Sequence, residues 1–193
     1  MTVATKLSLA RILLTFVIMA LLFVPGWAPK AWCLVLFGVA SLTDWLDGWV
    51  ARRFHQVTPL GILLDPIADK VLVIGVLMSF VQLGLIAAWM VLVIFLREML
   101  ITGVRLYAAR RQVVIPATRE GKHKTVSQRA AIILILVVLN LREWVAQPPS
   151  PAFEQGARLI ILAAMWWAVA LTVISGASFF WRNRSLLTHA SAR

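Results

Sequence analysis

The sequence has little of what a water-soluble domain requires. Charged residues make up only 14% of the 193 residues, and 61% are hydrophobic, whereas soluble domains average about 25% charged and about 45–50% apolar residues. A soluble fold of this length would leave too much apolar surface in water, and a disordered chain would need the opposite composition. With Cys33 as its single cysteine, the chain has no disulfide framework. The composition therefore indicates an integral membrane protein.

Six apolar stretches are long enough to form membrane-spanning helices. A bilayer core about 30 Å thick requires roughly 20 apolar residues in a helix, and a spanning backbone has to satisfy its own hydrogen bonds. The expected spans are residues 7–24, 31–52, 60–83, 85–109, 126–141 and 157–181. A signal peptide is the alternative for the first stretch, but no convincing cleavage site follows it. We therefore predict a single all-α membrane domain over residues 1–193 with six transmembrane helices.

Lysine and arginine are concentrated in alternate connections between these spans. One side of the membrane would carry Lys6, Arg11, Arg52, Arg53, Arg110, Arg111, Arg119, Lys122, Lys124, Arg182, Arg184 and Arg193. The other side would carry only Lys30, Arg142 and Arg158. Because cytoplasmic connections hold the excess of Lys and Arg, both termini are predicted to be cytoplasmic. This topology explains the net charge of +11 without a nucleic-acid partner, which would need a soluble basic face.

All four aspartates of the chain lie close together in the sequence. Asp44 and Asp47 are three residues apart near the end of the second span, and Asp65 and Asp69 are four apart near the start of the third. Each pair shares one helix face, and the short connection brings the two pairs together. Four carboxylates at membrane depth repel one another unless they are protonated or held by cations. Oxygen ligands select Mg²⁺, Mn²⁺ or Ca²⁺, so the spacing predicts a divalent-metal site that also holds substrate phosphates.

Small residues and an arginine stand beside these acids. Gly48, Ala51 and Gly61 either let neighbouring membrane helices approach closely or leave access for a ligand. Arg52 either anchors the topology or supplies a charge for a pyrophosphate. The residues alone leave both alternatives open.

The string from Asp44 to Asp69 reads D-x2-D-G-x2-A-R-x8-G-x3-D-x3-D, and it resembles the motif of the CDP-alcohol phosphatidyltransferases. The resemblance implies a six-span enzyme that transfers a phosphatidyl group from a CDP-linked lipid to an alcohol and releases CMP. It implies that the four aspartates hold two divalent ions, Mg²⁺ or Mn²⁺, and that Asp69 is also the base for the acceptor hydroxyl. It further implies contacts to the CDP-lipid from Gly48, Ala51, Arg52, Thr58, Gly61 and Ser8. In the N-terminal stretch Thr5 departs from the family, where Asn is usual.

Basic residues in the second half bear on which alcohol is accepted. Arg97 and Arg105 lie about two helical turns apart in the fourth span, and Lys124 opens the fifth. Arg97 could instead form an ion pair inside the bundle, and Arg105 and Lys124 could extend to the interface. Together the three could bind a phosphate on the acceptor. The pattern R-E-x6-R followed by G-K-x-K-T-x2-Q is similar to bacterial family members that make phosphatidylglycerophosphate, which implies sn-glycerol 3-phosphate as acceptor.

Two other functions stay open. A sister enzyme of the same family would use phosphatidylglycerol or an inositol phosphate as acceptor. A divalent-cation transporter would need a polar path across the whole bilayer, whereas residues 34–39 and 71–77 are nearly all apolar. The resemblance also implies a homodimer in the bacterial inner membrane, with CDP-diacylglycerol and membrane lipid as partners.

Overall fold

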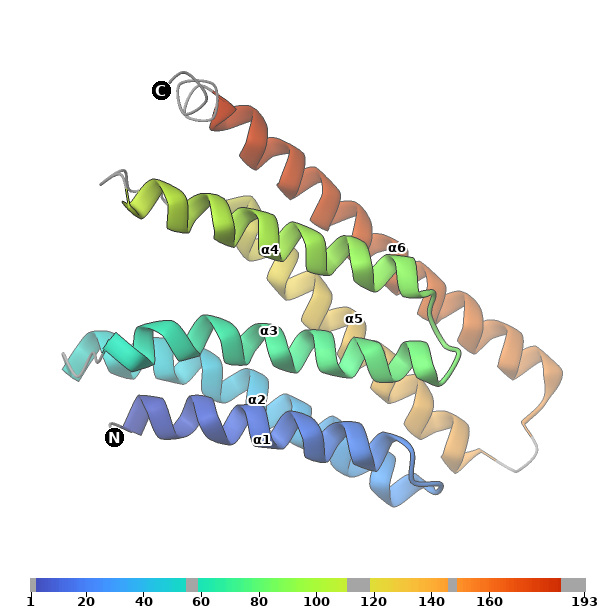
Figure 1. The fold of residues 1–193 in the computed structure, drawn as a ribbon. Coiled ribbons are helices and arrows are strands. Elements are labelled where there is room, and N and C mark those ends of the chain that lie inside the picture. The colour runs from blue at the N-terminus through green and yellow to red at the C-terminus, as the bar shows by residue number, and fades with distance from the viewer. Residues whose placement is uncertain (1–2, 55–58, 111–118, 146–148, 185–193) are drawn as a thin grey trace.

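The structure is a computed structural model that describes residues 3–54, 59–110, 119–145 and 149–184. Its side chains are described for residues 6–43, 67–109, 124–145 and 149–184. These ranges contain six helices and no strand, which confirms the predicted all-α fold. In chain order they are α1 (Val3–Leu22), α2 (Trp27–Phe54), α3 (Pro59–Gln82), α4 (Ala88–Arg110), α5 (Arg119–Trp144) and α6 (Pro151–Arg182) (Figure 1).

Two helices begin well before the apolar stretches that predicted them. Helix α6 begins at Pro151 because Ser150 caps it: the Ser150 hydroxyl accepts a hydrogen bond of 3.3 Å from the Phe153 N–H. The fixed φ of proline suits this first helical position. Helix α5 begins at Arg119, in the polar segment that precedes its apolar stretch. Hydropathy therefore located the helices correctly but underestimated the length of their polar ends.

Consecutive helices run in opposite directions, so their ends collect at two ends of the bundle (Figure 1). One end holds the starts of α1, α3 and α5 and the ends of α2, α4 and α6. We call this the motif end because the aspartate motif spans the end of α2 and the start of α3. The opposite end holds the turns between α1 and α2 and between α3 and α4, together with the end of α5 and the start of α6.

The bundle is held together by a continuous apolar core. Helix α1 packs against α2 and α3, α5 packs against α2 and α6, and α4 packs against α6 and α3. The α1–α3 contact is especially close, since a Cβ on Gly75 would lie 2.7 Å from Thr15 Cγ2 and 3.1 Å from Met19 Sδ. Glycine allows this approach, as small residues do between membrane helices. Fully buried side chains of the core include Ile18, Phe37, Leu72, Phe80, Ile94, Ile135 and Met165.

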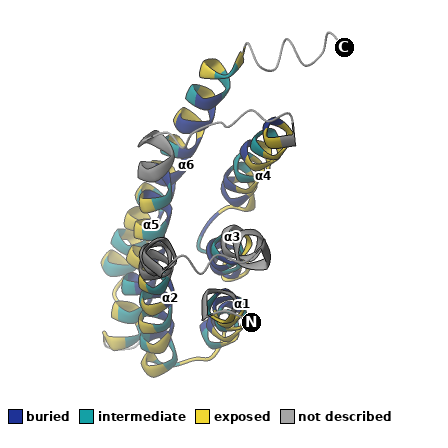
Figure 2. Cartoon of the chain, turned by 90° about the vertical axis from the view of Figure 1, so that its left-hand side faces the viewer, coloured by how far each residue is buried: buried dark blue, intermediate teal, exposed yellow. Residues whose placement is uncertain are grey.

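The outer surface of the bundle is apolar. Large hydrophobic side chains are exposed on all six helices, such as Phe16, Trp32 and Ile174, and Figure 2 shows the exposed positions on the outward sides of the helices. Among the described residues, Lys124–Trp144 and Pro151–Arg182 are long and apolar enough to cross a membrane, and Trp27–Thr43 is a shorter apolar helix. Water would not tolerate so much exposed apolar area, whereas lipid does.

Candidate functional site

The aspartate motif lies at the motif end, on two consecutive antiparallel helices (Figure 1). The last turns of α2 carry Asp44, Asp47, Gly48, Ala51 and Arg52, and the first turns of α3 carry Gly61, Asp65 and Asp69. The backbone therefore brings both aspartate pairs to the same end of the bundle, as the sequence predicted. Thr58 lies outside the described residues, and apart from Asp69 the side chains of this set lie outside the described ones.

Asp69 is the motif aspartate whose side chain is described. It is 27% exposed and forms an ion pair with Arg129 of α5, whose Nη2 donates to Asp69 Oδ1. Sequence reasoning missed Arg129. A signal was present, because Arg129 is the only charged residue among residues 126–141, and a charge within an apolar span calls for a partner. The carboxylate expected to act as base is thus held in place by a cation from another helix.

A second charged cluster is centred on Glu98 of α4. Glu98 Oε1 accepts hydrogen bonds from Lys124 of α5 and, at 2.9 Å, from Arg97 Nη1. The Lys124, Arg97 and Glu98 side chains are only 4%, 13% and 15% exposed. The internal ion pair considered for Arg97 is therefore present. Arg97 and Lys124, two of the three predicted phosphate-binding residues, therefore donate to the same oxygen of Glu98. The sequence had suggested no role for Glu98.

The third predicted phosphate-binding residue, Arg105, takes no part in the ion pairs around Glu98. Its guanidinium carbon lies 5.7 Å from the centre of the Phe179 ring on α6, within the range of a cation–π contact. The Nε atoms of Arg97 and Arg105 are both buried and have no hydrogen-bond partner among the described residues. Both arginines thus keep a donor that an anion could use.

A small cavity of about 10 Å³ connects the two charged clusters. Its lining includes Asp69 and Lys70 from α3, Glu98 from α4, and Lys124 and Gln128 from α5. Lys70 also donates a hydrogen bond to the Thr102 hydroxyl on α4. The carboxylate predicted to act as base and one residue predicted to bind phosphate therefore face a common space at the junction of three helices.

Ser8, predicted to lie near the donor lipid, is on the first turns of α1 at the motif end and is 1% exposed. Arg11, one turn later, is also buried. Both side chains face the interior of the bundle, where α1 packs against α2 and α3.

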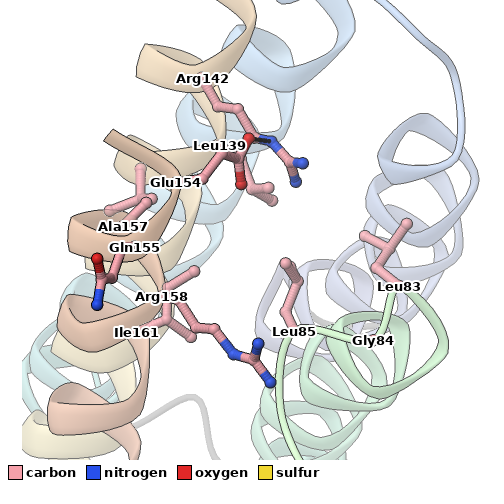
Figure 3. A pocket seen from close by; sticks show the side chains of 11 residues that line it. Leu83, Gly84, Leu85, Leu139, Arg142, Glu154, Gln155, Ala157, Arg158 and Ile161 are labelled. Atoms are coloured by element: carbon pink, nitrogen blue, oxygen red, sulfur yellow. Dashed lines mark hydrogen bonds and ion pairs between the residues drawn. The ribbon is translucent and has the colours of Figure 1, made fainter. Parts of the chain in front are cut away.

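A larger cavity, of about 450 Å³, lies at the opposite end (Figure 3). It is lined by the α3–α4 turn, the end of α5 and the first turns of α6. Arg142 Nε donates to Glu154 Oε1 at 2.8 Å between α5 and α6, and the two side chains are 44% and 39% exposed. Among the described side chains, neither Asp69 nor the predicted phosphate-binding residues line this cavity, so it is not our candidate for the reaction site.

The described side chains include no cluster of three or more His, Cys, Asp and Glu residues. This finding does not bear on the predicted metal site, since three of its four aspartates lie outside those side chains. Asp69, the fourth, offers carboxylate oxygens at the junction described above, which is the type of ligand that Mg²⁺ and Mn²⁺ prefer.

Comparison with known proteins agrees with the motif. The sequence profile of the family described as CDP-alcohol phosphatidyltransferase matches residues 1–174. The CDP-diacylglycerol–glycerol-3-phosphate 3-phosphatidyltransferase of Bacillus subtilis is 38% identical over 190 residues, which cover 92% of this chain and 93% of that protein. The Rickettsia typhi protein of the same name is 31% identical over 179 residues, covering 90% and 92%. The Mycoplasma pneumoniae protein of that name is 42% identical over 106 residues, covering 55% and 47%.

Proposed function

Because this chain belongs to the CDP-alcohol phosphatidyltransferase family, we propose that it transfers the phosphatidyl group of CDP-diacylglycerol to sn-glycerol 3-phosphate. The products are phosphatidylglycerophosphate and CMP, so the protein acts in phospholipid biosynthesis. Full-length similarity to proteins named for this reaction supports the donor and the acceptor. The structural observation that carries the acceptor is the buried pair of cations, Arg97 and Lys124, beside the cavity that Asp69 lines.

The acceptor's phosphate would be bound by Arg97, Arg105 and Lys124. A dianionic phosphate needs at least two cations, and the planar guanidinium matches its oxygens. The buried Nε donors of Arg97 and Arg105 support this assignment, since both have room in their hydrogen bonding for an additional acceptor. Glu98 would hold Arg97 and Lys124 together while no phosphate is bound. An uncharged acceptor would not need this cluster of cations.

Asp69 would take the proton of the acceptor hydroxyl as that oxygen attacks the phosphatidyl phosphorus and the bond to CMP breaks. Asp69 and Lys124 line one cavity of about 10 Å³, roughly the room for a single water, so the carboxylate and one predicted phosphate-binding cation are close neighbours. The Arg129 ion pair keeps the Asp69 carboxylate oriented. An oriented carboxylate contributes to the rate by holding the base in line with the hydroxyl.

We propose that Asp44, Asp47, Asp65 and Asp69 hold two divalent ions, Mg²⁺ or Mn²⁺. When bound, the ions neutralise the pyrophosphate and stabilise CMP as a leaving group. The i, i+3 and i, i+4 spacings support a shared site, because each pair lies on one helix face at the motif end. Gly48, Ala51, Arg52, Thr58, Gly61 and Ser8 are proposed, from the family motif, to contact the CDP-lipid.

We further propose that all six helices span a bacterial inner membrane, with the motif end and both termini on the cytoplasmic side. The apolar outer surface of every helix supports the spans, and the excess of basic residues near the motif end supports the orientation. A homodimer is proposed by analogy with the family alone.

An acceptor screen tests the proposed function. Purified protein is supplied with CDP-diacylglycerol, Mg²⁺ or Mn²⁺, and one acceptor: glycerol 3-phosphate, glycerol, inositol phosphate or phosphatidylglycerol. We expect rapid CMP release with glycerol 3-phosphate alone, and none after chelation of the metal. Preferred use of inositol phosphate or phosphatidylglycerol would favour the sister enzyme, and equal use of glycerol would remove the phosphate-pocket argument. Ion flux into vesicles without CMP release would favour a transporter.

A further inference from the structure

One buried face of α6 lies against three polar residues of α4 and α5. The face consists of Thr172, Ser175, Gly176 and Phe179, which are all buried. Their spacing of three, four and seven residues places them on one side of the helix. Helix α6 packs against both α4 and α5. The face has no charged residue and belongs to no motif that the sequence suggested.

Two neighbours on this face determine where Arg97 lies. Arg97 Nη2 donates a 2.7 Å hydrogen bond to Ser175 Oγ. A Cβ on Gly176 would lie 3.3 Å from Arg97 Cγ, so the aliphatic part of Arg97 rests on a position that has no side chain. Glu98 Oε1 accepts a 2.9 Å hydrogen bond from Nη1, the other terminal nitrogen of Arg97. Arg97 is thus held along its stem and at both terminal nitrogens.

The next turns of the same face hold residues from α5 and α4. Gln128 Nε2 donates to Thr172 Oγ1 at 2.9 Å, and Thr172 donates its own hydroxyl proton to the Ala168 carbonyl at 2.7 Å. The Thr172 oxygen is therefore oriented as an acceptor for Gln128. Gln128 lies one turn after Lys124 and lines the same small cavity. At the other end of the face, Phe179 supports the Arg105 guanidinium.

We propose that this α6 face is the template of the acceptor pocket: Thr172, Ser175, Gly176 and Phe179 are positioning residues that orient Gln128, Arg97 and Arg105 toward the acceptor's phosphate. The inference rests on the proposed function and deepens it by adding residues that set acceptor affinity without touching the acceptor. Ion pairing with Glu98 alone leaves a guanidinium free to rotate about its long stem, whereas the α6 contacts restrict it.

The other side of α6 has no such role. Val173 and Ile174 stand next to Thr172 and Ser175 in sequence but are 52% and 60% exposed on the apolar outer surface. Substitutions on α6 should therefore affect acceptor use on one face only. This dependence on the face separates positioning from a general requirement for an intact α6.

The test compares Michaelis constants for the two substrates. We expect Ser175→Ala and Thr172→Val each to raise the KM for glycerol 3-phosphate about fivefold to tenfold, which lies in the range for loss of one ordinary intramolecular hydrogen bond. The KM for CDP-diacylglycerol should change less than about twofold. Ser175→Thr, which retains the hydroxyl, should restore most of the affinity. Gly176→Ala should act in the same direction, because its methyl group displaces Arg97.

Matched controls come from the same chain. Ser79→Ala removes a buried hydroxyl of α3 that donates to Gly75 O at 3.2 Å. Gly156→Ala adds a methyl group to α6 where no atom lies within 4 Å. Both controls, and Val173→Ala, should leave the KM for glycerol 3-phosphate unchanged.

Thermal unfolding in detergent identifies the variants that fold. If Gly176→Ala does not fold, the comparison of Ser175→Ala with Ser175→Thr still tests whether the α6 face positions Arg97. Equal increases in both KM values for Ser175→Ala, or a similar increase for the controls, would overturn the template. If the wild-type protein does not use glycerol 3-phosphate at all, the proposed function fails instead.

Discussion

Both ends of the bundle pair arginine with glutamate beside a cavity, but they treat these charges differently. At the motif end Glu98 is 15% exposed and holds Lys124 and Arg97 from two helices. At the opposite end Arg142 and Glu154 are 44% and 39% exposed, beside a cavity of about 450 Å³. Burying charges away from water costs several kcal/mol per ion, whereas an exposed pair costs little. Cavity size does not separate the two regions, because a cavity of about 430 Å³ is lined by Lys70, Glu98 and Thr102 among others. Buried charge does separate them.

Among changes that compare the motif end with the opposite end, the largest expected effect is the loss of CMP release when a predicted metal ligand is replaced. Asp65→Asn should reduce CMP release at least about 1,000-fold, since bound metal contributes several kcal/mol to stabilising a transition state at phosphorus. The protein should still fold, because the substitution keeps the size of the side chain. Glu154→Gln, the same chemical change at the opposite end, is the control. Near wild-type turnover by Asp65→Asn would contradict the metal assignment.

A smaller but still large effect is expected on stability when the buried ion pair is broken. Glu98→Gln leaves Lys124 and Arg97 buried beside an uncharged amide, so the free energy of unfolding should fall by about 3 kcal/mol. Reversible unfolding in detergent measures this change. If Glu98→Gln were as stable as the wild-type protein, burial would not distinguish the two ends.

Arg105→Ala is expected to affect acceptor use selectively. Loss of one charged hydrogen-bonding partner should raise the KM for glycerol 3-phosphate about tenfold or more, with little change in the KM for CDP-diacylglycerol. Arg158→Ala removes an exposed arginine at the opposite end and should change neither constant. Steady-state CMP release with each substrate varied in turn measures both values. Equal loss of affinity for both substrates in Arg105→Ala would argue against a phosphate pocket.

The smallest effect is expected from the exposed ion pair itself. Glu154→Gln should change the free energy of unfolding by less than about 1 kcal/mol and leave both KM values unchanged. The same unfolding and CMP assays measure these quantities. A loss as large as that of Glu98→Gln would mean that the opposite end depends on its charges as much as the motif end does.

Much of the fold could be predicted from local properties of the chain. The length of the apolar stretches predicted six helices. The short connection between the two aspartate pairs predicted that both pairs lie at the same end of the bundle. Helix ends were less predictable, because the start of α6 depends on a Ser150 cap rather than on hydropathy.

The partners of the charged residues could not be predicted in the same way. Helical periodicity placed Arg97 and Arg105 about two turns apart, but it could not show that both contact α6. The pairing of Asp69 with Arg129 joins residues 60 positions apart and depends on how α3 packs against α5. Such pairings arise from packing between helices, which no single stretch of sequence records.

The alternating direction of the six helices has a consequence for the lipid product. The start of α1, the end of α6 and the aspartate motif lie at one end of the bundle, so the proposed topology would confine donor entry and product exit to a single leaflet of the bilayer. The described core between the two ends consists mainly of apolar side chains. With this topology, moving the lipid product to the other leaflet would be the task of a different protein.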